Sequence, residues 1–112
     1  MRRNIQKLCF DILRAIDDIK TFTRDLDFEK YRQNRVVKLA VERDYEIIGE
    51  ALKRMEVRFR SNFLTITDGR KIIDFRNLLA HGYDDVADEI VWDITCSDVR
   101  VLEVKAILRN HQ

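Results

Sequence analysis

The scarcity of residues that turn a chain constrains this sequence more than any other feature. It has no proline and only three glycines, Gly49, Gly69 and Gly82, among 112 residues. Sheet proteins need many tight turns, and glycine and proline supply the backbone conformations of those turns. Long helices joined by few loops are therefore expected. The length predicts a single domain over residues 1–112.

Apolar residues recur at alternating spacings of three and four along most of the chain, which is the period of an amphipathic helix. The pattern predicts a first long helix from Asn4, as its N-cap, to about Arg24. A further short turn is expected at residues 28–33. Asn34 is expected to cap a second long helix that runs to about Phe59. The apolar stripe of the first helix consists of Ile5, Leu8, Ile12, Ala15, Ile19 and Phe22.

The second half of the chain continues the same pattern. Residues 61–67 are expected to form a connection. Asp68 is expected to cap a third helix that ends near Gly82, where glycine suits a left-handed C-cap. The predicted fold class is all-α, an antiparallel bundle of four to five helices. Its last two helices are expected at residues 84–94 and, with Ser97 or Asp98 as the N-cap, up to about Arg109.

Charge is distributed unevenly, although the net charge is only +1. Residues 53–71 hold six basic residues against two acidic ones, and residues 84–98 hold six acidic residues and no Lys or Arg. The basic stretch is a candidate surface for phosphate, and equally an ordinary solvated helix face. The acidic run would repel RNA and suits a basic partner.

The cysteines and the hydropathy pattern indicate a protein of the reducing cytoplasm. Cys9 and Cys96 are too few and too far apart for a disulfide framework or a zinc site, so both are expected to be small buried side chains. No stretch is apolar for long enough to be a signal peptide or a membrane span. A cytoplasmic location without membrane contact is therefore expected.

Histidine is the side chain best suited to move protons near neutral pH, and this chain has two. His111 is the second-last residue, which leaves His81 as the histidine expected to be held in place. No cluster of ligands has the spacing of a catalytic metal site, and no glycine-rich loop suits a phosphate. We therefore expect neither a metal nor a cofactor.

The residues around His81 are compatible with phosphodiester chemistry. Asn77 precedes His81 by one helical turn, where the two side chains can meet. Arg76 can hold a phosphate in a two-pronged grip, and Tyr83 follows closely. Residues five apart on a helix point about 140° away from each other. Arg76 and His81 need not converge within one chain, so a composite site across a symmetric dimer is attractive. A purely structural His-Gly pair at a helix end remains the alternative.

The segment Arg76–Tyr83, with the sequence Arg-Asn-Leu-Leu-Ala-His-Gly-Tyr, resembles the signature of the HEPN superfamily. Its Arg-x4-His-x-Tyr pattern is most similar to the HepT branch, the toxin halves of HepT–MntA pairs. The segment Tyr45–Arg54 is similar to the Glu-Ile-Ile-Gly-Glu-Ala stretch on that family's second long helix, and Ile90-Val91-Trp92 also fits. The resemblance extends over nearly the whole chain.

This resemblance implies a dimerising helical bundle that acts as a metal-independent endoribonuclease toxin of a type VII toxin–antitoxin system. Arg76 and His81 match the family's catalytic pair, and Asn77 matches the polar residue that supports it. Tyr83 matches the tyrosine to which an MntA-like nucleotidyltransferase antitoxin transfers AMP, silencing the toxin. The implied partners are an RNA substrate, a second copy of the chain and that antitoxin.

Two other functions stay open at the level of sequence. The chain can be a non-catalytic subunit that binds a nucleotide or serves as the partner of a minimal nucleotidyltransferase. It can also be a bundle that acts only through protein interaction. The presence of both Arg76 and His81 favours the ribonuclease over these two functions, because a pure scaffold would not need both residues. For Tyr83 the alternative is a ring that merely packs over the end of the bundle.

Overall fold

The computed structural model describes residues 2–80, 84–96 and 99–110, and these ranges contain helices and no strands. The all-α prediction is therefore confirmed. Five helices have twelve or more residues and two are short. The helices are α1 (Arg2–Thr23), α2 (Phe28–Gln33), α3 (Arg35–Arg58), α4 (Arg60–Phe63), α5 (Gly69–Ala80), α6 (Asp84–Thr95) and α7 (Val99–Asn110).

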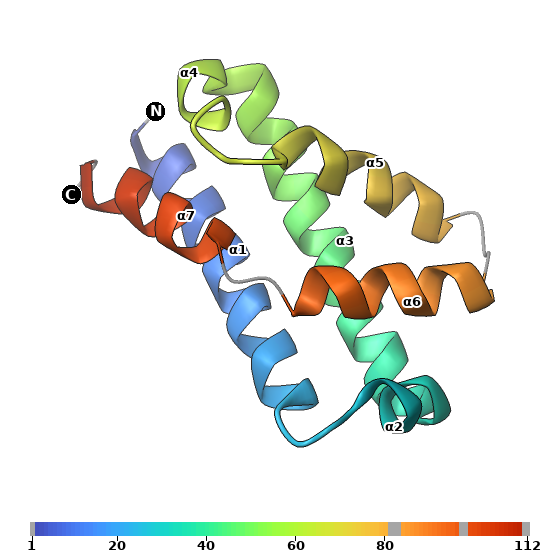
Figure 1. Cartoon of the computed structure of the whole chain (residues 1–112). Coiled ribbons are helices and arrows are strands. Elements are labelled where there is room, and N and C mark those ends of the chain that lie inside the picture. Colours follow the sequence, from blue (N-terminus) through green and yellow to red (C-terminus); the bar gives the residue numbers. More distant parts are fainter. Residues whose placement is uncertain (1, 81–83, 97–98, 111–112) are drawn as a thin grey trace.

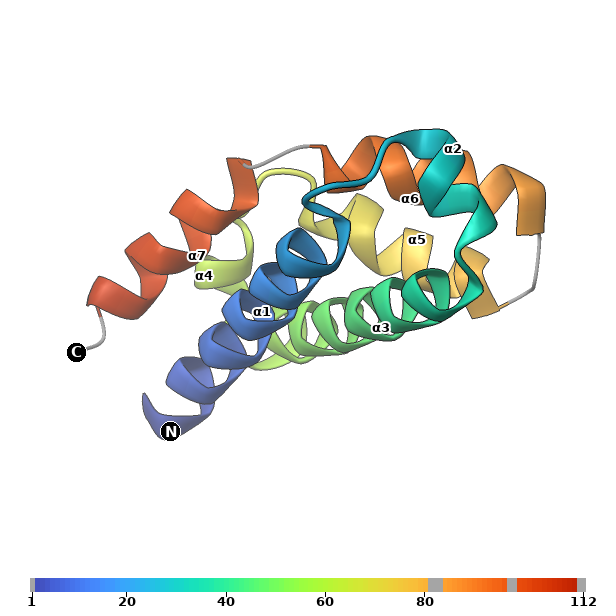
Figure 2. The ribbon, with the colours of Figure 1, turned by 90° about the horizontal axis from the view of Figure 1, so that it is seen from below.

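The two longest helices, α1 and α3, lie side by side and run in opposite directions (Figure 1). α5 packs on α3 and α7 packs on α1, while α6 contacts the short helix α2. Figure 2 shows the same arrangement from below, with α5 and α6 on one side of the α1–α3 pair. α3 thus lies at the centre of the bundle and contacts the helix that carries the Arg76 segment.

The core is one cluster of apolar side chains drawn from all parts of the bundle. The predicted stripe of α1 is buried from Ile5 to Ile19, but Phe22 at its end is 40% exposed. Among the side chains that the structure describes, α3 contributes six buried apolar residues, as many as α1, in agreement with its central position. The set consists of Val41, Tyr45, Ile48, Ala51, Leu52 and Met55.

Asparagine and aspartate cap two of the helices, of which the sequence predicted the asparagine cap. The Asn34 side chain accepts a hydrogen bond of 3.0 Å from the Val37 N–H, which caps α3. Asp27 caps α2 in the same way. The prediction for Asn4 is wrong, because α1 already begins at Arg2 and Asn4 lies inside the helix.

Asp68 immediately precedes α5, as predicted, but its backbone is not that of an ordinary N-cap. Its φ of 60° places it in the left-handed region, whereas most N-caps are extended. Its carbonyl oxygen accepts the hydrogen bond of the Ile72 N–H, 3.1 Å away, so the helix starts at the expected place.

The predicted connection at residues 61–67 is partly wrong, because α4 occupies its first half. Phe63 and Ile66 are both buried and anchor this segment in the core. Thr65 donates a side-chain hydrogen bond of 2.7 Å to the Asn62 carbonyl. A helix of four residues is too short to show a hydrophobic period, which explains why the pattern did not indicate it.

The remaining predicted boundaries agree with the helices where the structure describes them. α6 and α7 cover the predicted ranges within a few residues. The expected caps Gly82, Ser97 and Asp98 lie outside the described residues. Among the described helices none is both long and apolar enough to cross a membrane.

Candidate active site at the contact between α3 and α5

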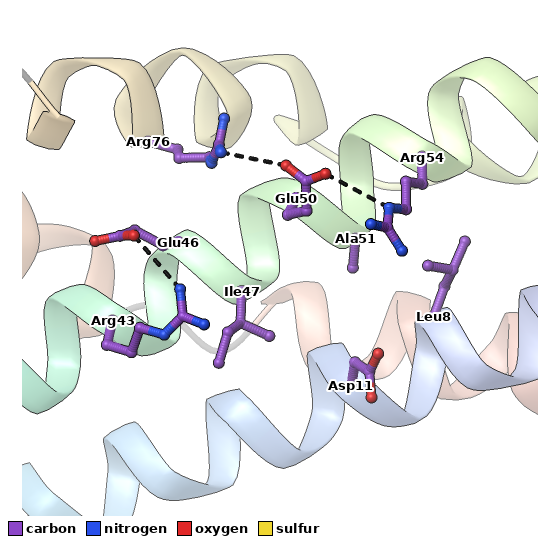
Figure 3. A pocket seen from close by; sticks show the side chains of 9 residues that line it. All are labelled: Leu8, Asp11, Arg43, Glu46, Ile47, Glu50, Ala51, Arg54 and Arg76. Atoms are coloured by element: carbon purple, nitrogen blue, oxygen red, sulfur yellow. Dashed lines mark ion pairs between the residues drawn. The ribbon is translucent and has the colours of Figure 1, made fainter.

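Arg76 is directed from α5 toward α3, where a carboxylate holds its guanidinium. Nη2 of Arg76 lies 3.2 Å from Oε2 of Glu50 (Figure 3). The Arg76 side chain is 32% exposed, so its stem is covered while the charged end still meets solvent. The arginine that the sequence singled out therefore has a defined position.

Gly49 makes this position possible. A Cβ atom at residue 49 would lie 2.8 Å from both Cβ and Cδ of Arg76, a distance that real Cβ atoms do not reach. Glycine in the interior of a helix costs about 1 kcal/mol relative to alanine. The long helix α3 tolerates that cost at residue 49, and the result is that the stem of Arg76 lies directly on its backbone.

Glu50 contacts two arginines at once. Its Oε2 faces Arg76, and its Oε1 lies 3.5 Å from Nε of Arg54, which is one helical turn further along α3. Figure 3 shows the two guanidiniums on either side of the carboxylate. A guanidinium has five N–H donors, so a contact to one carboxylate oxygen leaves each arginine able to bind a phosphate as well.

These side chains line a groove of about 290 Å³ that extends from α3 to α1. Leu8 and Asp11 come from α1, and Arg43 of α3 enters the same groove beside Glu46, 3.6 Å away. The groove contains three arginines and three carboxylates, so its formal charges balance. An anionic ligand would have to compete with these carboxylates for the arginines.

The other predicted site residues are placed only in part. Asn77 follows Arg76 on α5 and its side chain is exposed. His81 and Tyr83 lie outside the described residues, and α5 is described as far as Ala80. Of the four predicted site residues, Arg76 and Asn77 are therefore the two that the structure describes.

The comparison with known families gives a direct match. A family model described as HepT-like, Ribonuclease HepT-like, matches residues 12–107. The chain belongs to the ribonuclease HepT-like family.

Relatives of this HepT-like chain are found in archaea. A protein of Thermococcus cleftensis named "Probable ribonuclease HepT" is 32% identical over 105 residues, which is 94% of each chain. A Methanocaldococcus jannaschii protein named "Putative RNase" is 32% identical over 98 residues, covering 88% of this chain and 89% of the relative. A second one from that organism is 36% identical over 92 residues, with 82% and 78% covered. No solved structure gives a significant match.

The side chains of the basic and the acidic stretch of this HepT-like chain do not all lie on one exposed surface. Within the basic stretch, Arg54 enters the groove, whereas Arg70 pairs with Glu56 of α3 at 3.0 Å. Within the acidic run, Asp88 is buried and pairs with Lys38 of α3 at 2.9 Å. Asp88 therefore belongs to the contact between α3 and α6 and not to a docking surface.

The cysteine prediction is half right for this HepT-like domain. Cys9 is fully buried, and burial raises the pKa of its thiol to about 11, so it stays protonated. Cys96 is exposed, contrary to expectation. Within the described residues no three His, Cys, Asp or Glu side chains gather as they would around a metal ion.

Sequence reasoning assigned no role to Gly49 or Glu50, and it named Arg54 only as part of the basic stretch, although all three lie in the Tyr45–Arg54 segment that resembles the HepT family. One signal was available. A glycine in the interior of an otherwise strong helix often marks a close approach of another element. The pattern alone did not indicate that the approaching residue is Arg76.

Proposed function

We propose that this HepT-like chain is a metal-independent endoribonuclease in which Arg76 and His81 are the catalytic pair. The observation that supports this most is the position of Arg76, whose stem lies on Gly49 and whose partly exposed guanidinium is held by Glu50. An arginine fixed in this way is suited to bind a phosphodiester through two hydrogen bonds. The names of the relatives support ribonucleic acid as the substrate.

The chemistry needs no metal ion because RNA carries its own nucleophile. The 2′-hydroxyl attacks the neighbouring phosphorus and loses its proton to a general base, while the 5′-oxygen leaves and gains a proton from a general acid. His81 serves as base or acid, and Arg76 stabilises the charge on the non-bridging phosphate oxygens. The products are a 2′,3′-cyclic phosphate and a 5′-hydroxyl. DNA lacks the nucleophile and is expected to survive.

The test is cleavage of a defined RNA in the presence of EDTA. Arg76→Ala and His81→Ala are expected to abolish cleavage while the helical circular dichroism signal persists. Arg70→Ala is the matched control, because Arg70 lies on the same helix and also pairs with a carboxylate of α3, but at a distance from the groove. Loss of wild-type cleavage in EDTA, or normal cleavage by His81→Ala, would contradict this mechanism.

The proposal includes the regulation implied by the family. The chain would be the toxin of a type VII toxin–antitoxin pair in the cytoplasm, and an MntA-like nucleotidyltransferase would transfer AMP to the Tyr83 hydroxyl. Tyr83 stands two residues after His81, so the attached nucleotide would obstruct RNA through its bulk and its negative charge. An adjacent gene for a small nucleotidyltransferase would support the assignment.

Intact mass spectrometry after incubation with the partner and ATP tests the acceptor. The wild type is expected to gain the mass of AMP, and Tyr83→Phe, which keeps the ring, is expected not to. An undiminished adduct on Tyr83→Phe would place the acceptor elsewhere. A chain that binds the partner but never cleaves RNA would instead be the non-catalytic binding subunit.

A further inference from the structure

Glu50 contacts the proposed catalytic arginine but has no role in the mechanism described so far. We propose that Glu50 is a positioning residue of the active site, which orients the guanidinium of Arg76 from the neighbouring helix. The inference deepens the proposed ribonuclease function and rests on it. It assigns a purpose to the Gly-Glu pair in the middle of α3.

Three contacts support this role. The stem of Arg76 is set by Gly49, where no Cβ atom fits, and its end is set by Oε2 of Glu50 at 3.2 Å. The second oxygen of Glu50 faces Nε of Arg54 at 3.5 Å, so the carboxylate itself is held from the other side. A long arginine side chain that is free in solution samples many rotamers. Here both its base and its charged end are constrained.

The partial exposure of the Arg76–Glu50 ion pair indicates that its role is to position Arg76 and not to stabilise the fold. The side chains of Arg76 and Glu50 are 32% and 45% exposed, and ion pairs of this kind contribute little to stability in water. A contact that contributes little to stability but fixes a catalytic group acts mainly on the rate, because reacting groups must be aligned closely.

Because Glu50 is negatively charged, its removal is expected to affect kcat and KM differently. A carboxylate near the bound phosphate repels it, so removing that charge is expected to leave RNA binding unchanged or slightly tighter. Removing the contact that orients Arg76 is expected to slow the chemical step. The signature is therefore a fall in kcat without a rise in KM. Because a smaller folded fraction would also lower the apparent kcat, the variants are compared at equal helical circular dichroism signal.

The same two helices provide a matched control. Glu56 of α3 pairs with Arg70 of α5 at 3.0 Å, so it too makes an ion pair between α3 and α5. Glu56 does not line the groove into which Arg76 projects. Glu50→Ala and Glu56→Ala each remove one negative charge and one α3–α5 ion pair, but only Glu50→Ala releases Arg76.

The first experiment measures kcat and KM on one RNA. Glu50→Ala is expected to lower kcat about tenfold to a hundredfold, the size of effect caused by a misplaced catalytic group. Glu50→Gln, whose neutral amide oxygen is able to accept a hydrogen bond from Arg76, is expected to have a kcat between those of Glu50→Ala and wild type. Glu56→Ala is expected to keep kcat within about twofold. A Glu50→Ala enzyme with wild-type kcat, or an equal loss in Glu56→Ala, would overturn the proposal.

The second experiment does not depend on RNA cleavage. The Nη–Hη resonances of the Arg76 guanidinium, assigned by their absence in Arg76→Lys, are expected to exchange slowly with solvent in wild type and in Glu56→Ala but not in Glu50→Ala, because Nη2 is the atom that faces Glu50. Equal protection in Glu50→Ala would refute the role of Glu50. If wild type cleaves no RNA while this NMR pattern is found, the proposed function fails and the positioning contact stands.

Discussion

Gly49 illustrates how one residue without a side chain can determine where another residue lies. In an exposed helix interior, replacing glycine by alanine usually stabilises the protein by about 1 kcal/mol. At residue 49 the new methyl group would meet Cβ and Cδ of Arg76 at 2.8 Å. These atoms are near the backbone of α5, so the helix itself would have to move.

We therefore expect Gly49→Ala to lower stability by about 1–3 kcal/mol, the range typical of overpacking, and to reduce RNA cleavage. Urea denaturation measures the first effect and a cleavage assay the second. Val104→Ala in the buried part of α7 is the control for destabilisation remote from the groove. Stabilisation by Gly49→Ala would show that the side chain of Arg76 does not lie on the backbone of α3 at residue 49.

Asp44 is a buried carboxylate whose ionisation opposes folding. It is 7% exposed, and burial together with the charge of Asp18 raises its pKa from 3.8 to about 6, although Arg43 and Arg14 act in the opposite direction. Below pH 3.8 the group is protonated in both the folded and the unfolded chain. Above about pH 6 the folded chain bears the full penalty of a buried charge.

Asp44→Asn is accordingly expected to raise the free energy of unfolding by about 3 kcal/mol at pH 7.5 and to leave it unchanged near pH 3.5. The gain should develop between pH 3.8 and about pH 6. Urea denaturation across this range measures it. Asp17→Asn, at an exposed position of α1, is the control. A gain that is independent of pH would mean that the charge of Asp44 is not its cause.

At the scale of elements, α6 is attached to the bundle by apolar packing, by a buried ion pair and by aromatic contacts. Lys38 of α3 reaches Asp88 of α6 at 2.9 Å, and the Asp88 side chain is 6% exposed. The Trp92 ring of α6 lies 5.3 Å from the Tyr31 ring of α2, measured between centroids. These contacts hold α6, the helix that follows the Arg76–Tyr83 segment in the sequence, on the bundle.

Lys38→Met is expected to destabilise the protein by about 3 kcal/mol, because it leaves the Asp88 carboxylate buried without its counter-ion. The double variant Lys38→Met/Asp88→Leu is expected to recover most of that loss, since no buried charge remains. Urea denaturation of the three proteins checks the order. If the double variant were as unstable as Lys38→Met, the buried charge would not be the reason.

At the scale of the whole molecule, the site is expected to be completed by a second copy. The prediction rests on the divergence of about 140° between residues five apart on one helix, such as Arg76 and His81. Sedimentation at micromolar concentration is expected to give twice the chain mass of 13.4 kDa. A monomer under these conditions would exclude the composite site.

Mixing two inactive variants tests the composite site more directly. If Arg76 of one copy acts with His81 of the other, a heterodimer of Arg76→Ala and His81→Ala contains one intact site. Random exchange of subunits is then expected to restore about a quarter of wild-type cleavage, because half of the dimers are mixed and each has one functional site of two. No recovery after confirmed subunit exchange would mean that Arg76 and His81 must act from the same copy.

The sequence by itself determined what is local along the chain. The 3.6-residue period and the scarcity of glycine and proline predicted the all-α class and the five long helices, and Asn34 as a cap predicted where α3 begins. The Arg76–Tyr83 segment indicated the family. These properties depend on residues that are close together in the sequence, so they can be predicted from the sequence pattern alone.

Only the tertiary structure decided which residues from distant parts of the chain meet. The contact of Gly49 and Glu50 with Arg76 joins positions more than twenty residues apart, and the burial of Asp88 depends on Lys38 fifty positions earlier. Such contacts follow from how α3, α5 and α6 pack, and this packing depends on how the side chains of the whole core fit together. A periodic pattern says which face of a helix is buried, but not which side chain of another helix will cover it.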